Sequence, residues 1–77
     1  MEGQGVYHYR SGDEFEGLWK GDKKHGPGVM REIGGKTLTG TWNMNKKQGE
    51  FKTIDAAGKK LKIVYNEDAI ISQVEIQ

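Results

Sequence analysis

The chain has 77 residues, a formal net charge of +1 and no cysteine. This length allows one small domain with a thin core, which would bury only about 60% of its unfolded surface. The absence of cysteine excludes a disulfide framework and a thiolate zinc site. The near-neutral charge excludes a strong global field that would recruit nucleic acid.

The chain opens with polar residues, and no apolar run approaches the roughly 20 residues that a membrane-spanning helix needs. We therefore expect no secretory signal peptide, no transmembrane helix and a cytoplasmic location. Glycine supplies 12 residues and proline only one, as is typical of a regular sheet with many tight turns.

The sequence repeats with a period of 23 residues, in copies at 3–25, 26–48 and 49–71, with a tail at 72–77. A fixed period in this range is the signature of a repeat architecture. Glycine heads each copy, and large apolar residues recur at two slots: Phe15, Leu38 and Leu61, then Trp19, Trp42 and Tyr65. The sequence thus predicts a single repeat domain.

The first copy predicts a β-hairpin, because glycine is too frequent for a helix and β-type residues flank a turn signal. A three-residue loop at 11–13 places Tyr7 opposite Gly17 and Gly5 opposite Trp19. A two-residue loop would shift the register by one residue and change the faces. The odd loop is the preferred prediction.

Glycine also occupies the middle of predicted strands, at Gly17 and Gly40. The preferred interpretation is that these glycines leave room for large rings on the same face. The alternative is that they only permit turns or bulges.

The third copy departs from the pattern, with Phe51 and Ile63 where the earlier copies have glycine. Atypical end units are expected of repeat proteins. In the tail, Ile70, Val74 and Ile76 share a parity with Ser72, which predicts a short closing strand. A docked helical turn is the alternative.

Catalytic chemistry is not indicated. His8 and His25 have no partner at metal-ligand spacing, and the predicted register pairs His8 with Glu16 on the surface. The Gly-x-Gly pairs lack the residues of a phosphate-binding loop. We expect no catalytic residue, no metal and no cofactor.

Two residue groups are candidates for partner binding. The first is expected on one face of the sheet, as either a core or an apolar binding strip: Tyr7, Tyr9, Phe15, Trp19, Met30, Leu38 and Trp42. The second is a predicted basic ridge along one edge: Lys23, Lys24, Lys46 and Lys47. The ridge would contact an acidic protein or anionic lipid, or would only protect the edge from aggregation.

The run Phe15-Glu16-Gly17-Leu18-Trp19, followed by His25-Gly26-Pro27-Gly28, resembles the MORN repeat. The second copy matches in part, at Leu38-Thr39-Gly40-Thr41-Trp42, and the third is degenerate. The resemblance implies an all-β, single-layer twisted antiparallel sheet of tandem hairpins. It also implies a non-catalytic scaffold that binds a peptide or helix along its aromatic face, in a cytoskeletal or ciliary assembly. The alternative is a peripheral adaptor on anionic membranes, and a homodimer is left open.

Overall fold

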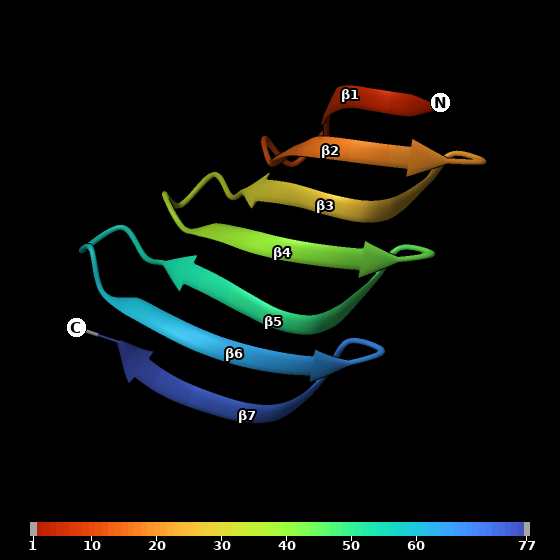
Figure 1. The fold of residues 1–77 in the computed structure, drawn as a ribbon. Coiled ribbons are helices and arrows are strands. Elements are labelled where there is room, and N and C mark those ends of the chain that lie inside the picture. Colours follow the sequence, from red (N-terminus) through yellow and green to blue (C-terminus); the bar gives the residue numbers. More distant parts are fainter. Residues whose placement is uncertain (1, 77) are drawn as a thin grey trace.

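The computed structural model describes residues 2–76, which form one antiparallel sheet whose seven strands follow the sequence order (Figure 1). The strands are β1 (Gly3–His8), β2 (Glu14–Lys20), β3 (Lys23–Arg31), β4 (Thr37–Asn43), β5 (Lys46–Ile54), β6 (Lys60–Asn66) and β7 (Ala69–Ile76). The sheet is open, with β1 and β7 at its two edges. The predicted fold is confirmed, and the tail belongs to a strand rather than to a helical turn. Within residues 2–76 no helix is long and apolar enough to cross a membrane.

The first hairpin loop has the predicted three residues but begins one residue earlier than predicted. Tyr9 donates its backbone N–H to Asp13 O at 2.8 Å, and Gly12 donates to Tyr9 O at 2.9 Å. Gly12 is the last loop residue, at φ 101°. A three-residue hairpin loop combines a type I turn with a final left-handed residue, so glycine belongs at the end of this loop and not in its middle.

The register of the first hairpin is therefore shifted by two residues from the prediction. Tyr7 lies opposite Phe15 rather than Gly17, and Gly5 lies opposite Gly17 rather than Trp19. The predicted faces survive, because side chains alternate along a strand and a two-residue shift preserves parity. Loops at 32–36 and 55–59 form the same pair of backbone hydrogen bonds.

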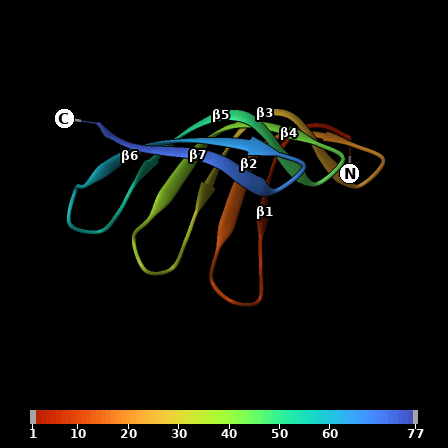
Figure 2. The same cartoon turned by 90° about the horizontal axis from the view of Figure 1, so that it is seen from below.

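One face of the sheet carries the core and is called the aromatic face; the other is the reverse face. The buried apolar residues of the aromatic face are Phe15, Trp19, Leu38, Trp42, Phe51, Ile63 and Tyr65. Figure 2 shows the sheet arched, with the three-residue loops bending toward the same side. Tyr9, which precedes the first of these loops, packs against the core, so this loop bends toward the aromatic face.

Mid-strand glycines leave room for large rings on the same face, as predicted. A Cβ atom on Gly17 would lie 2.9 Å from Phe15 Cζ, and one on Gly28 would lie 2.4 Å from the same atom. A Cβ on Gly40 would lie 2.6 Å from Phe51 Cγ. At Gly17 the backbone of β3 is nearer still, because the same Cβ would lie 2.7 Å from Gly28 Cα and from Pro27 O.

Two-residue turns join successive hairpins at the other end of the strands. Their central residues have positive φ in each case: Gly21 and Asp22, Met44 and Asn45, Glu67 and Asp68. Positive φ at both positions defines a type I′ turn, whose twist matches that of the flanking strands.

Each later type I′ turn is hydrogen-bonded to the repeat before it. Asn45 Oδ1 accepts from Lys24 N at 2.8 Å, and Asn45 N donates to Lys24 O at 2.9 Å. Asp68 makes the same two bonds to Lys47, at 2.7 and 2.9 Å. These reciprocal pairs, which we call the turn clamps, fix the spacing of successive hairpins.

Glycine also shapes a wide bulge in β3. Gly17 and Trp19 are two residues apart in β2, whereas their partners in β3, Gly28 and Lys24, are four residues apart. Strand β3 therefore has two extra residues at this point. The bulge contains Gly26 at φ 110°, a conformation that L-residues with side chains rarely adopt. The counterpart in β5 has the same two-residue shift and a glycine at φ 85°. Because the number of extra residues is even, the side chains of both strands stay on the same face before and after the bulge.

The last strand, β7, lacks this glycine and changes face as a result. Ser72 stands at the equivalent position and does not adopt a positive φ. Two successive residues of β6 are paired with Ser72 and Ile70, which are two residues apart in β7, so β7 has one extra residue here. An odd shift exchanges the faces of a strand, so Val74 and Ile76 lie on the reverse face while Ile70 lies on the aromatic face. The closing strand predicted from the shared parity of these residues is confirmed, but the bulge divides their side chains between the two faces.

Candidate partner-binding site

The aromatic rings form one continuous chain of contacts across the sheet. Ring centroids are 4.8 to 5.9 Å apart and the planes are tilted or edge-on, through Tyr9, Tyr7, Trp19, Phe15, Trp42, Phe51 and Tyr65. Aromatic pairs prefer this geometry, which is worth about 0.5–1.5 kcal/mol beyond the buried area. The indole N–H of Trp19 also donates to Gly5 O at 3.3 Å.

Most of these rings are core rather than free binding surface. Trp19 is 7% exposed and Trp42 is 2% exposed, so of the two alternatives, core or binding strip, these two rings are core. The rings cover each other in a single-layer sheet because each repeat places its large residue over the glycines of its neighbours. Truncation of either tryptophan consequently tests stability before it tests binding.

The accessible part of the aromatic face lies beside this core. Tyr7 is 47% exposed, and Tyr9 and Met30 are only partly buried. Next to them is a groove of about 260 Å³, which we call the lysine groove. Its lining includes Lys24 and Lys47. Phe15 and Leu38 lie in the core beneath.

Two ammonium groups lie over aromatic rings at this groove. Lys24 Nζ is 5.7 Å from the centroid of Tyr9 and 5.5 Å from that of Phe15, and it donates to Tyr9 Oη at 3.4 Å. Lys47 Nζ is 4.6 Å from the centroid of Tyr65. Such cation–π contacts are favourable when the cation is partly desolvated.

The lysine groove has mixed charge, because the carboxylates of Glu32 and Asp68 line it together with Lys24 and Lys47. Burial lowers the pKa of Lys24 below its ordinary value, the positive charge of Lys47 lowers it further, and the carboxylate of Asp68 opposes both. Among residues 2–76, neither lysine forms a salt bridge. A ligand carboxylate or phosphate placed here would meet two partly desolvated donors.

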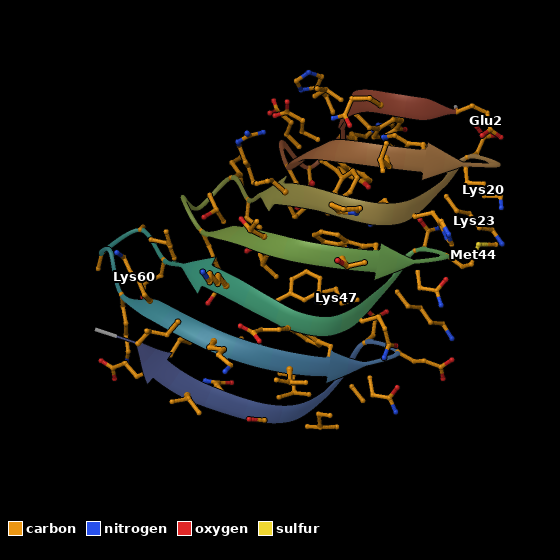
Figure 3. All side chains as sticks on the ribbon, viewed as in Figure 1. Glu2, Lys20, Lys23, Met44, Lys47 and Lys60 are labelled. Atoms are coloured by element: carbon orange, nitrogen blue, oxygen red, sulfur yellow. The ribbon has the colours of Figure 1, made fainter. Side chains whose placement is uncertain are left out.

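The predicted ridge of four lysines is divided by the fold. The side chains of Lys24 and Lys47 lie on the aromatic face. Lys23 and Lys46 are exposed at the end of the strands where the type I′ turns are. Figure 3 shows Lys20, Lys23 and Met44 at this end of the strands and Lys60 at the other end. Of the four predicted residues, only Lys23 and Lys46 therefore share an exposed surface beside the type I′ turns.

Of the two histidines, His8 lies beside a carboxylate, whereas the buried Nδ1 of His25 has no hydrogen-bond partner in residues 2–76. His8 Nδ1 lies 3.3 Å from Glu14 Oε2, so the predicted pairing of His8 with Glu16 is wrong. Glu16 instead pairs with Arg31 at 2.8 Å. Within the part of the chain that the structure describes, no group of three His, Cys, Asp or Glu residues is placed to hold a metal.

The turn clamps were not anticipated, although the sequence carries their signal. Asp22, Asn45 and Asp68 recur at the 23-residue period, and Asx residues tolerate the left-handed conformation better than most. The 23-residue recurrence of an Asx residue was therefore the signal for these turns. The lysine groove depends on these turns, because Asn45 and Asp68 are part of its lining.

Comparison with protein families gives one result. The family model described as MORN repeat matches residues 1–14, 15–31 and 39–50, which together make more than half of the chain. The matched units begin at residues 1, 15 and 39 rather than at the glycines that head the 23-residue copies, because the starting point of a tandem repeat is arbitrary. A search of curated proteins finds no match.

Proposed function

Because the chain belongs to the MORN-repeat family, we propose that it is a non-catalytic scaffold that binds a protein segment along its aromatic face. The observation that carries this proposal is the pair Lys24 and Lys47, which lie over aromatic rings in an accessible groove without a salt-bridge partner in residues 2–76. A cytoskeletal or ciliary setting is part of the proposal only through the family.

The partner segment that fits combines an anionic group with apolar contacts. A carboxylate between Lys24 and Lys47 would form charge-assisted hydrogen bonds, each worth about 1.5–3 kcal/mol. Tyr7, Tyr9 and Met30 offer an apolar surface beside that position. Tyrosine is a common hot-spot residue because it combines a large ring with a polar tip.

The test is selection of binders from a displayed random-peptide library, followed by affinity measurement with the selected peptides. We expect acidic peptides that also carry apolar residues, and at least a tenfold loss of affinity for Lys24→Met, which is about 1.4 kcal/mol. Tyr7→Ser should also weaken binding. Lys20→Met, at an exposed lysine outside the lysine groove, is the matched control and should bind normally. Selected peptides that bind all of these variants equally well would refute the proposed site.

A second candidate function, on anionic membranes, is favoured by one observation. Met44 is 47% exposed at φ 49°, at the tip of a type I′ turn between Lys23 and Lys46. An apolar side chain held outward in an unfavourable backbone conformation gains nothing from the core. Beside exposed lysines, it is suited to a bilayer surface, where each cation near anionic lipid contributes about 1 kcal/mol.

Vesicle flotation separates the two candidates. For the membrane function we expect co-flotation with vesicles containing phosphatidylserine, loss of flotation at high salt, and weaker flotation for Met44→Ser and Lys23→Ala. Lys24→Met should then float normally, because that ammonium lies on the aromatic face. Absence of flotation at low salt would eliminate the membrane function and leave peptide binding untouched.

A further inference from the structure

The reverse face carries a second surface, built by the three C-terminal strands. Two neighbouring rows cross β5, β6 and β7: Lys52, Lys62 and Val74 in one row, and Ile54, Lys60 and Ile76 in the other. Cross-strand partners lie about 4.5–5.5 Å apart between Cβ atoms and share a face. We call these six residues the reverse-face block.

The apolar members of this block are exposed in spite of their size. Ile54 is 41% exposed, Val74 is 56% and Ile76 is 36%. Val74 and Ile76 lie here because Ser72 replaces the bulge glycine and shifts β7 by a single extra residue. With the bulge of β3 and β5, these two side chains would lie on the aromatic face instead.

The basic members of the block repel one another. Lys52 is directly opposite Lys62, and like charges at directly opposed positions destabilise a sheet. Lys62 has one weak salt bridge, to Glu50 at 3.9 Å. Within residues 2–76, Lys52 and Lys60 have none. Two of the three lysines in the block, Lys52 and Lys60, therefore lie beside exposed apolar side chains without a carboxylate partner in residues 2–76.

A hollow lies within the block. Its volume is about 290 Å³, and its lining includes four members of the block, Lys52, Ile54, Lys60 and Ile76, together with Thr53 and Leu61, which are paired with each other on the aromatic face. This is slightly below the range of about 300–1,000 Å³ of pockets for drug-sized ligands, and suits one inserted side chain of a partner. Cationic groups at the rim of an apolar hollow match an anchor residue flanked by carboxylates.

We propose that the reverse-face block binds an acidic protein segment, with one apolar side chain of that segment in the hollow and its carboxylates on Lys52 and Lys60. A recessed surface favours this occupant over a membrane, because a bilayer presents no side chain to fill a hollow. The site lies on the face opposite to the lysine groove, and it does not depend on the function proposed for that groove.

An NMR titration tests the proposal directly. The probe is a heptapeptide with a central leucine and three glutamates on either side, and its control has serine in place of leucine. We expect saturable amide shift changes at Ile54, Leu61 and Ile76, and at least fivefold weaker binding for the serine peptide. Lys60→Gln should weaken binding at least fivefold, whereas Lys24→Met should leave these shifts unchanged.

A stability measurement completes the test. Lys52→Glu replaces a like-charge pair by an opposite-charge pair, so the melting temperature should rise while peptide binding falls at least tenfold. Equal binding of the leucine and serine peptides would overturn the proposal, as would shifts confined to the lysine groove. Flotation with anionic vesicles that is lost in Lys52→Gln, together with no peptide binding, would assign the block to membranes and overturn it as well.

Discussion

Replacing Gly40 by alanine tests how strictly the core depends on absent side chains. The added Cβ would lie 2.6 Å from both Cγ and Cδ1 of Phe51 and 2.7 Å from Cδ2, well inside van der Waals contact. The Phe51 ring is fully buried, 4.8 Å from the Trp42 centroid and 5.2 Å from that of Tyr65. It has no free direction in which to move.

Overpacking of this kind costs about 1–3 kcal/mol. A protein of this length has a stability of about 4–12 kcal/mol, so the Gly40→Ala protein stays folded. A loss of about 2 kcal/mol lowers the melting temperature by about 8–16 °C. Thermal unfolding followed by circular dichroism, together with urea denaturation, measures both quantities.

The matched control is Gly34→Ala, because a Cβ on Gly34 meets nothing within 4 Å. Its effect should be neutral or slightly stabilising, since alanine reduces the entropy of the unfolded chain. The second control is the Phe51→Leu background, where Gly40→Ala should cost less than half as much. An equal cost in both backgrounds would refute the conclusion that the ring occupies the space of the missing side chain.

Three further predictions follow from the turns, the groove and the last strand. Asn45→Gly keeps the left-handed turn but removes one clamp bond, so it should lower the free energy of unfolding by about 0.5–1.5 kcal/mol, and no loss in urea denaturation would contradict the clamp. Lys47→Met should raise the pKa of Lys24 by removing a nearby positive charge, and NMR titration of the lysine side chain that shows no rise would contradict the assigned coupling. Ser72→Gly should permit the wider bulge and move Ile76 to the aromatic face, and unchanged interstrand NOEs would show that another feature sets the register of β7.

The sequence predicted the sheet because its strongest signal, the 23-residue period, does not depend on details of pairing. Face assignments were equally secure, since parity survives the two-residue error in register. The loop position failed because Gly12 was placed by symmetry in the middle of the loop. The turn type requires the left-handed residue at the end.

The candidate site was less predictable. Exposure of Trp19 and Trp42 depends on how neighbouring repeats fill the space above the glycines, which is a property of the assembled sheet. The separation of Lys23 from Lys24 depends on which face each residue takes beside a turn. The reverse-face position of Val74 depends on one serine at a bulge position, a signal that parity counting along the strand does not contain.

The order of the strands has a mechanical consequence. The outermost strands, β1 and β7, lie at opposite edges of the sheet, and each strand pairs only with its neighbours in sequence (Figure 1). Tension between β1 and β7 would act across the strands, so the hydrogen bonds of these two outer strands would carry the load first. Each released strand would add length while the inner strands keep their pairing. Such a sheet would extend in small steps under load.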